Sequence, residues 1–160
     1  MGEELEGIYN RYSGFAYNVA LRMLGNTMDA EDVLQDVFIK LQHKLSTFKG
    51  DSSIKTFLYR MVINQSIDHI RRRGSQTSRA ERSTRESHQS VNDSSLLLDS
   101  LLEKIPAEQR AAILLYEICG FSQKEVASIL NISQGTVKSR ISRGITKMAS
   151  SACREVLDAL

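Results

Sequence analysis

Residues 122–148, SQKEVASILNISQGTVKSRISRGITKM, decide the fold of the C-terminal part of this chain. Val126 and Ala127 lie on a predicted short helix capped by Ser122, and Asn131 tolerates the left-handed backbone of a tight turn. A second helix, capped by Ser133, then carries one apolar stripe at Val137, Ile141, Ile145 and Met148. This order of helix, turn and amphipathic helix is typical of a helix-turn-helix.

The other face of that second helix carries amide, hydroxyl and basic side chains: Gln134, Thr136, Lys138, Ser139, Arg140, Ser142 and Arg143. Arginine and lysine can donate hydrogen bonds to guanine O6 and N7, so this face suits the major groove of DNA. The alternative is a solvated helical hairpin whose charges only confer solubility.

Three helices are predicted in the N-terminal part. The first spans about residues 3–24 and ends at Gly25-Asn26. Asp29 is expected to cap the second, with Asp32 as its capping-box partner. The third runs from about residue 52 to Arg73. The apolar stripe of the second helix comprises Leu34, Val37, Phe38, Leu41 and Leu45, and that of the third comprises Ile54, Phe57, Leu58, Met61, Ile67 and Ile70.

A serine-rich stretch at residues 74–95 separates these helices from the rest of the chain. It holds seven Ser and one large aliphatic residue, Val91, and is predicted to be a flexible linker. Direct contact with a polyanion through its arginines is the alternative. A helix is then expected at 96–104. Pro106 is expected at a helix N1 position, followed by helical residues 107–119, and the last helix is expected from Ser133 to about residue 150. The expected fold is all-α, with domains at 1–73 and 96–160.

Composition bounds the function. The 160 residues are 41% hydrophobic and 25% charged. The sequence contains no run of about 18 apolar residues, so no membrane-spanning helix is predicted. The acidic N-terminus does not resemble a signal peptide, so a cytoplasmic protein is expected. Cys119 and Cys153 are interpreted as reduced thiols. No catalytic set, metal site or cofactor site is predicted.

Charge is distributed unevenly. Residues 1–40 carry three basic and seven acidic side chains, whereas residues 71–90 carry six Arg and two Glu. Residues 121–150 carry five basic side chains and one acidic one. This pattern suggests a protein partner for the acidic part and a polyanion for the basic parts. The net charge of only +2 argues that tight DNA binding needs help from a partner.

Four blocks in order resemble the extracytoplasmic-function (ECF) sigma factors of bacterial RNA polymerase. DAEDVLQDVFIKL and FKGDSSIKTFLYRMVINQSIDHIRRR resemble parts of sigma region 2, and IPAEQRAAILLYEICGFSQKEVA and SQGTVKSRISRG resemble parts of region 4. The resemblance implies binding to core RNA polymerase and to promoter DNA without membrane insertion. An anti-sigma factor is a further partner that it implies.

By this resemblance, the acidic face formed by Asp32, Gln35 and Asp36 contacts the β′ clamp helices, although a solvated face is the alternative. The C-terminal domain is expected to contact the β flap. Aromatic rings and cations near residues 48–60 suit the binding of single-stranded DNA. The residues assigned to the promoter −10 element are Phe48, Lys49, Asp51, Ser52, Lys55, Tyr59, Arg60 and Asn64. An interhelical hydrogen bond is the alternative role of Asn64.

In the recognition helix, Lys138, Ser139 and Arg143 are expected at base edges or nearby phosphates of the −35 element, and Arg140 at a phosphate. Because the Ser142 side chain is short, it is expected to leave a base without a contact. The chain has no Trp, whereas primary sigma factors bring a tryptophan pair to DNA melting, so a near-consensus promoter is expected to be needed. The residues alone leave two other classes of protein open: a dimeric helix-turn-helix repressor and a helical adaptor that does not bind DNA.

Overall fold

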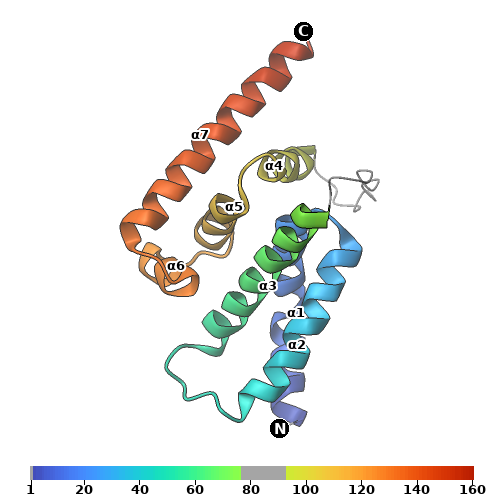
Figure 1. Cartoon of the computed structure of the whole chain (residues 1–160), viewed down its shortest axis with the longest axis vertical. Coiled ribbons are helices and arrows are strands. Elements are labelled where there is room, and N and C mark those ends of the chain that lie inside the picture. Colours follow the sequence, from blue (N-terminus) through green and yellow to red (C-terminus); the bar gives the residue numbers. More distant parts are fainter. Residues whose placement is uncertain (1, 77–92) are drawn as a thin grey trace. The chain divides into compact units, whose positions relative to one another are not determined.

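The computed structural model describes residues 2–76 and 93–160, and all regular secondary structure in that part of the chain is helical (Figure 1). The prediction of an all-α fold is confirmed. The chain divides into two compact units, Met1–Glu86 and Ser87–Leu160. The predicted linker lies mostly outside the described residues. Its two ends are helical, because one helix continues to Gln76 and the next begins at Asp93.

Unit 1 (Met1–Glu86) consists of α1 (Gly2–Leu24), α2 (Thr27–Leu45) and α3 (Ile54–Gln76), and each helix packs against the other two. The turn between α1 and α2 is short because Gly25 adopts a φ of +70° and ends α1. Asn26 then caps α2 in an extended conformation, and its Oδ1 accepts a hydrogen bond from the Asp29 backbone N at 3.0 Å. The predicted Asp29 cap is therefore wrong, since the helix begins two residues before Asp29.

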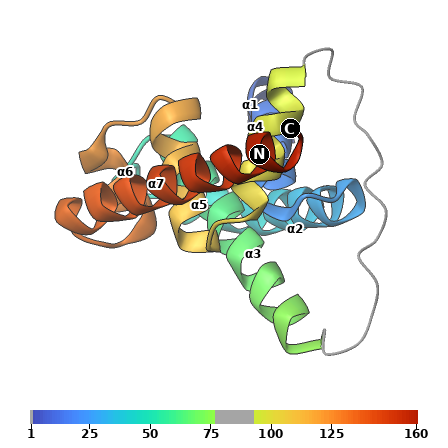
Figure 2. The same ribbon diagram turned by 90° about the horizontal axis from the view of Figure 1, so that it is seen from above.

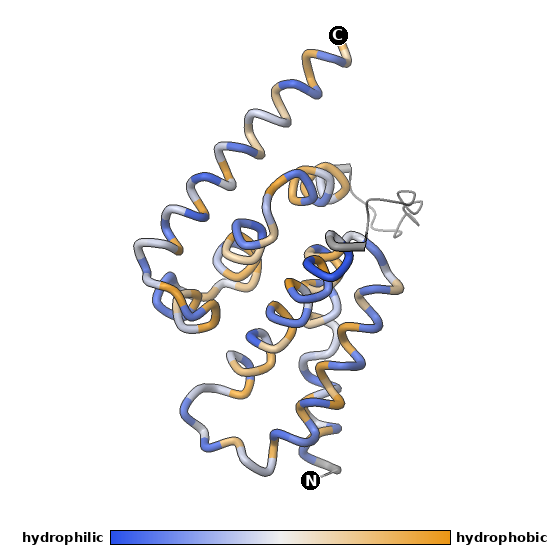
Figure 3. The backbone as a smooth tube through the Cα atoms, viewed as in Figure 1, coloured by the Kyte–Doolittle hydropathy of each residue, from blue (hydrophilic) through white to orange (hydrophobic). Residues whose placement is uncertain are grey.

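The buried faces of α2 and α3 differ in part from the predicted stripes. In α2 the buried residues are Ala30, Val33, Val37, Phe38 and Leu41. In α3 they are Leu58, Tyr59, Val62, Ile63 and Ser66. Leu34 and Leu45 of the predicted stripes are half-buried, because each helix lies against two neighbours and its buried face is centred between them. The hydropathy of the chain alternates accordingly along α2 (Figure 3).

Unit 2 (Ser87–Leu160) consists of α4 (Asp93–Glu103), α5 (Ala107–Ile113), the π-helical turn η1 (Leu114–Ile118), α6 (Gln123–Leu130) and α7 (Gln134–Asp158). Pro106 is the N-cap of α5 and not its first residue. Arg110 is 9% exposed, and its Nη2 donates to the carbonyl oxygens of Glu103 and Ile105 at 3.2 and 3.1 Å. Burial lowers the pKa of this guanidinium, partly offset by Glu103. Arg110 thus fixes the turn between α4 and α5.

The long helix α7 packs against α5 and α6, and Figure 2 shows it in a second view. It continues to Asp158, eight residues beyond the predicted end at 150. Its buried residues are Val137, Ile141 and Gly144, whereas Ile145 is 46% exposed. The prediction of Ile145 in the apolar stripe is therefore wrong, because α7 meets α5 at Gly144, one position earlier. No helix in residues 2–76 or 93–160 is long and apolar enough to cross a membrane.

Candidate nucleic-acid and protein interfaces

Local hydrogen bonds set the geometry of the helix-turn-helix formed by α6 and α7. The Ser122 Oγ accepts from the Glu125 backbone N at 3.2 Å, and the Glu125 carboxylate accepts from the Ser122 backbone N at 2.7 Å. Asn131 ends α6 in the left-handed region with φ 54°. Ser133 caps α7 by accepting from the Thr136 backbone N at 3.1 Å. Both predicted caps and the predicted left-handed turn are confirmed.

The predicted −35 residues lie on the first three turns of α7, but they are exposed to different degrees. Gln134, Lys138, Ser142 and Arg143 are exposed. Thr136, Ser139 and Arg140 are half-buried. The Thr136 hydroxyl lies 2.8 Å from the Ser133 hydroxyl, and the Ser139 Oγ donates to the Thr136 carbonyl oxygen at 3.0 Å. With its proton engaged, the Ser139 hydroxyl can still accept a hydrogen bond from a DNA base.

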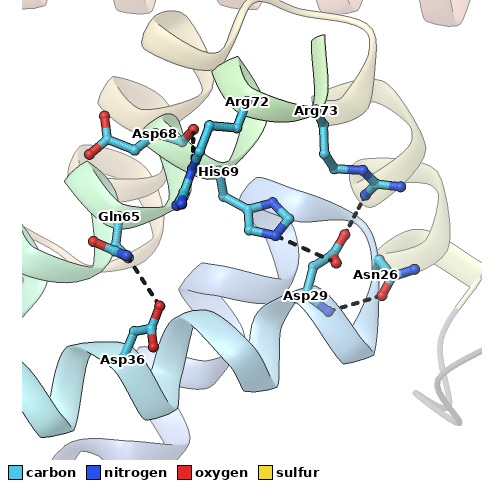
Figure 4. Close-up of polar contacts among 8 residues, drawn as sticks. All are labelled: Asn26, Asp29, Asp36, Gln65, Asp68, His69, Arg72 and Arg73. Carbon is cyan, nitrogen blue, oxygen red and sulfur yellow. Dashed lines mark hydrogen bonds and ion pairs between the residues drawn. The ribbon is translucent and has the colours of Figure 1, made fainter. Parts of the chain in front are cut away.

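The three predicted polymerase-contacting residues share the outer face of α2. Asp32, Gln35 and Asp36 are all exposed, and they lie opposite the buried Ala30 and Leu41. Asp36 also accepts a hydrogen bond from Gln65 Nε2 of α3 at 3.4 Å (Figure 4). The result is a solvent-facing cluster of two carboxylates and one amide on a single helix.

The loop that joins α2 to α3, residues 46–53, carries part of the predicted −10 site. Lys49 and Asp51 are exposed and Ser52 is half-buried, while Gly50 adopts a φ of +74° that favours glycine. The Phe48 ring packs on the Phe57 ring with centroids 5.1 Å apart. Both residues are half-buried, so they pack at the base of the loop and stay partly exposed to solvent.

The first three turns of α3 carry the rest of that predicted site. Asn64 is exposed, and Lys55 and Arg60 are half-buried. Tyr59, however, is only 2% exposed, and its ring lies in the core of unit 1 with Lys55 Nζ 6.0 Å from the ring centroid. A ring that is buried in this way has no face on which a base can stack, so the assignment of Tyr59 to the DNA contact is corrected to a core role.

A polar cluster at the end of α3 was missed by sequence reasoning. Asp29 of α2 forms an ion pair with Arg73 and lies 3.6 Å from His69 Nε2 (Figure 4). His69 and Arg73 are spaced i, i+4, so they share one face of α3. That spacing was visible in the sequence, but the partner lies 44 residues from Arg73 along the chain. The contact joins the start of α2 to the last turns of α3.

Chemical groups that indicate catalysis are scarce in the described residues. Within the ranges 2–76 and 93–160 no group of three or more His, Cys, Asp or Glu side chains could hold a metal ion. Cys119 is half-buried and Cys153 is exposed. Burial and the nearby Glu31 raise the pKa of Tyr17.

Comparison with known proteins assigns both units. Residues 8–76 match sigma-70 region 2 and residues 95–148 match sigma-70 region 4. The chain therefore has the two conserved modules of a sigma factor of bacterial RNA polymerase. Its fold is similar to that of the Bartonella quintana sigma factor RpoE, solved in complex with the anti-sigma factor NepR, with a TM-score of 0.78, 23% identity and coverage of 92% of this chain and 96% of that one.

Relatives narrow the class to one family. The chain is 34% identical over 155 residues to the ECF RNA polymerase sigma factor SigW of Bacillus subtilis, and the match covers 86% of this chain and 82% of SigW. It is 31% identical over 147 residues to the ECF RNA polymerase sigma factor SigE of Mycolicibacterium smegmatis, of which it spans 57%. The chain belongs to the ECF sigma factors, and it is a factor for promoter-specific transcription initiation by RNA polymerase. The repressor and adaptor hypotheses are therefore set aside.

Proposed function

We propose that the two units divide promoter recognition between them. Unit 2 recognises the −35 element through α7, and unit 1 captures the −10 element through the 46–53 loop and α3. The outer face of α2 docks on the β′ clamp helices of core polymerase, and unit 2 contacts the β flap. Phosphodiester chemistry belongs to the polymerase, so the chain itself is no enzyme, and it acts in the cytoplasm without a cofactor.

The observation that carries this proposal is the exposed face of α7. Lys138, Ser142 and Arg143 are exposed on the first three turns, where a recognition helix meets base edges. Val137 and Ile141 are buried on the opposite side and fix the rotation of the helix. We assign Lys138 and Arg143 to base edges or adjacent phosphates and Arg140 to a phosphate. Gln134, Thr136, Ser139 and Ser142 complete the contact surface.

The −10 contact rests on the loop and on one face of α3. Phe48 supplies a partly exposed ring, Lys49 and Lys55 supply cations, and the exposed amide of Asn64 can pair with a base edge. Asp51, Ser52 and Arg60 are assigned to the rim of the same surface. Tyr59 is left out because its ring is buried.

Docking on polymerase rests on charge. Asp32 and Asp36 form an exposed acidic face with Gln35 between them. Complementary charge at such a face raises the association rate more than the final affinity. A solved relative with this fold binds an anti-sigma factor. We therefore propose that an anti-sigma factor holds this chain inactive by covering these surfaces.

A transcription assay with core polymerase tests the −35 assignment. Lys138→Ala is compared with Lys147→Ala, which removes the same charge from an exposed position on α7 outside the proposed surface. Loss of one phosphate contact should reduce the slope of log affinity for promoter DNA against log salt concentration by about 1. Loss of a base contact should weaken the free energy of promoter binding by about 1–3 kcal/mol. Equal effects of both variants would contradict the proposed surface.

A second comparison tests the docking face. Asp32→Asn/Asp36→Asn should slow association of the full chain with core polymerase, and the slowing should diminish at high salt. Asp68→Asn, which removes one carboxylate from an exposed part of α3, is the charge-matched control for Asp32→Asn and Asp36→Asn made singly. The isolated chain should bind promoter DNA weakly, since its net charge is only +2. Tight specific binding without core polymerase would contradict the division of labour proposed above.

A further inference from the structure

Gln65 of α3 lies between two oppositely charged residues of α2. Its Oε1 accepts a hydrogen bond from Lys40 Nζ at 2.7 Å, and its Nε2 donates to Asp36 Oδ2 at 3.4 Å. Figure 4 shows the Gln65 amide directed at the Asp36 carboxylate across the gap between the helices. One side chain thus contacts both the cation and the anion.

Without Gln65, Asp36 and Lys40 would be expected to pair directly. They are spaced i, i+4 on α2, with the acid N-terminal to the base, which is the favourable order for a helical ion pair. In the described part of the chain no direct ion pair joins them, and the lysine ammonium is held by the glutamine oxygen instead. Among the described residues the Asp36 carboxylate receives only the longer amide contact, so no cation pairs with it directly.

We propose that Gln65 is a positioning residue that holds Lys40 away from Asp36 and so keeps the acidic face of α2 charged for docking on core RNA polymerase. This inference rests on the docking role proposed for Asp36. Gln65 itself is half-buried between the helices and does not belong to the proposed contact surface.

The size of the effect follows from the strength of the pair that Gln65 prevents. An i, i+4 ion pair of this kind must be broken before Asp36 can meet a cation of the polymerase. Breaking this pair would reduce the affinity of the chain for core polymerase about twofold at low ionic strength. The loss should appear mainly in the association rate, and added salt should remove it because both groups are exposed.

The experiment measures association of the full chain with immobilised core RNA polymerase at low and high salt. Gln65→Leu keeps the side-chain size and removes both hydrogen bonds, so association should slow about twofold. Gln65→Glu retains an oxygen that can hold Lys40, so its rate should stay at or above that of the wild type. Lys40→Gln removes the competing cation, and Gln65→Leu in this background should have no effect.

Asp36→Asn distinguishes failure of the inference from failure of the docking proposal. If Asp36→Asn slows association but Gln65→Leu does not, the docking face stands and the role of Gln65 is overturned. If Gln65→Leu slows association equally with and without Lys40, Gln65 acts only through the packing of unit 1, and the inference is again overturned. If Asp36→Asn has no effect, Asp36 does not take part in docking and the inference is overturned, while Asp32→Asn/Asp36→Asn still tests the rest of the docking face.

Discussion

Two glycines of α7 provide a matched test of the packing between α5 and α7. Gly135 is exposed, and a β-carbon added there would meet only the Ser133 Oγ, at 3.9 Å. Gly144 is buried, and a β-carbon there would lie 2.6 Å from Ile113 Cδ1, 3.4 Å from Gln109 Cβ and 3.5 Å from Ile105 Cδ1. The same substitution should therefore have different effects at the two sites.

The magnitudes follow from helix propensity and packing. Alanine is favoured over glycine in a helix by about 1 kcal/mol, so Gly135→Ala should stabilise unit 2 by up to about that amount. In Gly144→Ala the Ile113 terminal methyl must move by about 1 Å, at a cost of about 0.5–1.5 kcal/mol that cancels the gain. Gly144→Leu adds three more carbons to a filled site, and overpacking should destabilise unit 2 by about 1–3 kcal/mol.

Urea unfolding of the full chain, followed by circular dichroism at 222 nm, measures the order of stability. Hydrogen exchange of peptides from α5 and α7 assigns the change to unit 2. We expect Gly135→Ala to be most stable, then Gly144→Ala, then Gly144→Leu. Equal stability of the two Gly144 variants would refute the close approach of α5 and α7 at this position.

Three further predictions concern the elements that hold unit 2 together. Asn131→Val should destabilise unit 2 by about 1–2 kcal/mol, because a β-branched residue is strained at a φ of 54°, whereas Asn131→Gly should not; thermal melting compares the two. Ser122→Ala removes one bond of the capping box and should cost about 1 kcal/mol, with faster hydrogen exchange at the Glu125 amide. Arg110→Met should cost about 2 kcal/mol, because the buried carbonyl oxygen of Ile105 and the partly buried one of Glu103 lose their donor; urea unfolding measures the loss, and an unchanged midpoint contradicts it.

Features that depend on neighbouring residues were predictable from the sequence. Ser122 and Ser133 cap their helices and Asn131 takes the left-handed turn, because each of these outcomes depends on contacts within about four residues. The one wrong cap illustrates the limit of such rules. Asn26 and Asp29 are both suitable caps, and the φ of Gly25, which sets where α1 ends, selects Asn26.

Features that depend on how helices cross were not predictable. Gly144 and Ile145 both fit a helical repeat with Val137, and only the approach of α5 decides that Gly144 is buried. In the sequence Tyr59 lies close to a polar loop, which predicts an exposed ring. The orientation of α3 nevertheless places this ring in the core of unit 1. The contact between Gln65 and Asp36 spans 29 residues of sequence, so no local pattern reveals it.

The short turn at Gly25-Asn26 has a consequence for how unit 1 folds. It makes α1 and α2 a helical hairpin whose partners are neighbours along the chain, and α3 then packs against both. Chains dominated by such local contacts fold within microseconds to milliseconds. We expect unit 1 to refold on that timescale after dilution from denaturant.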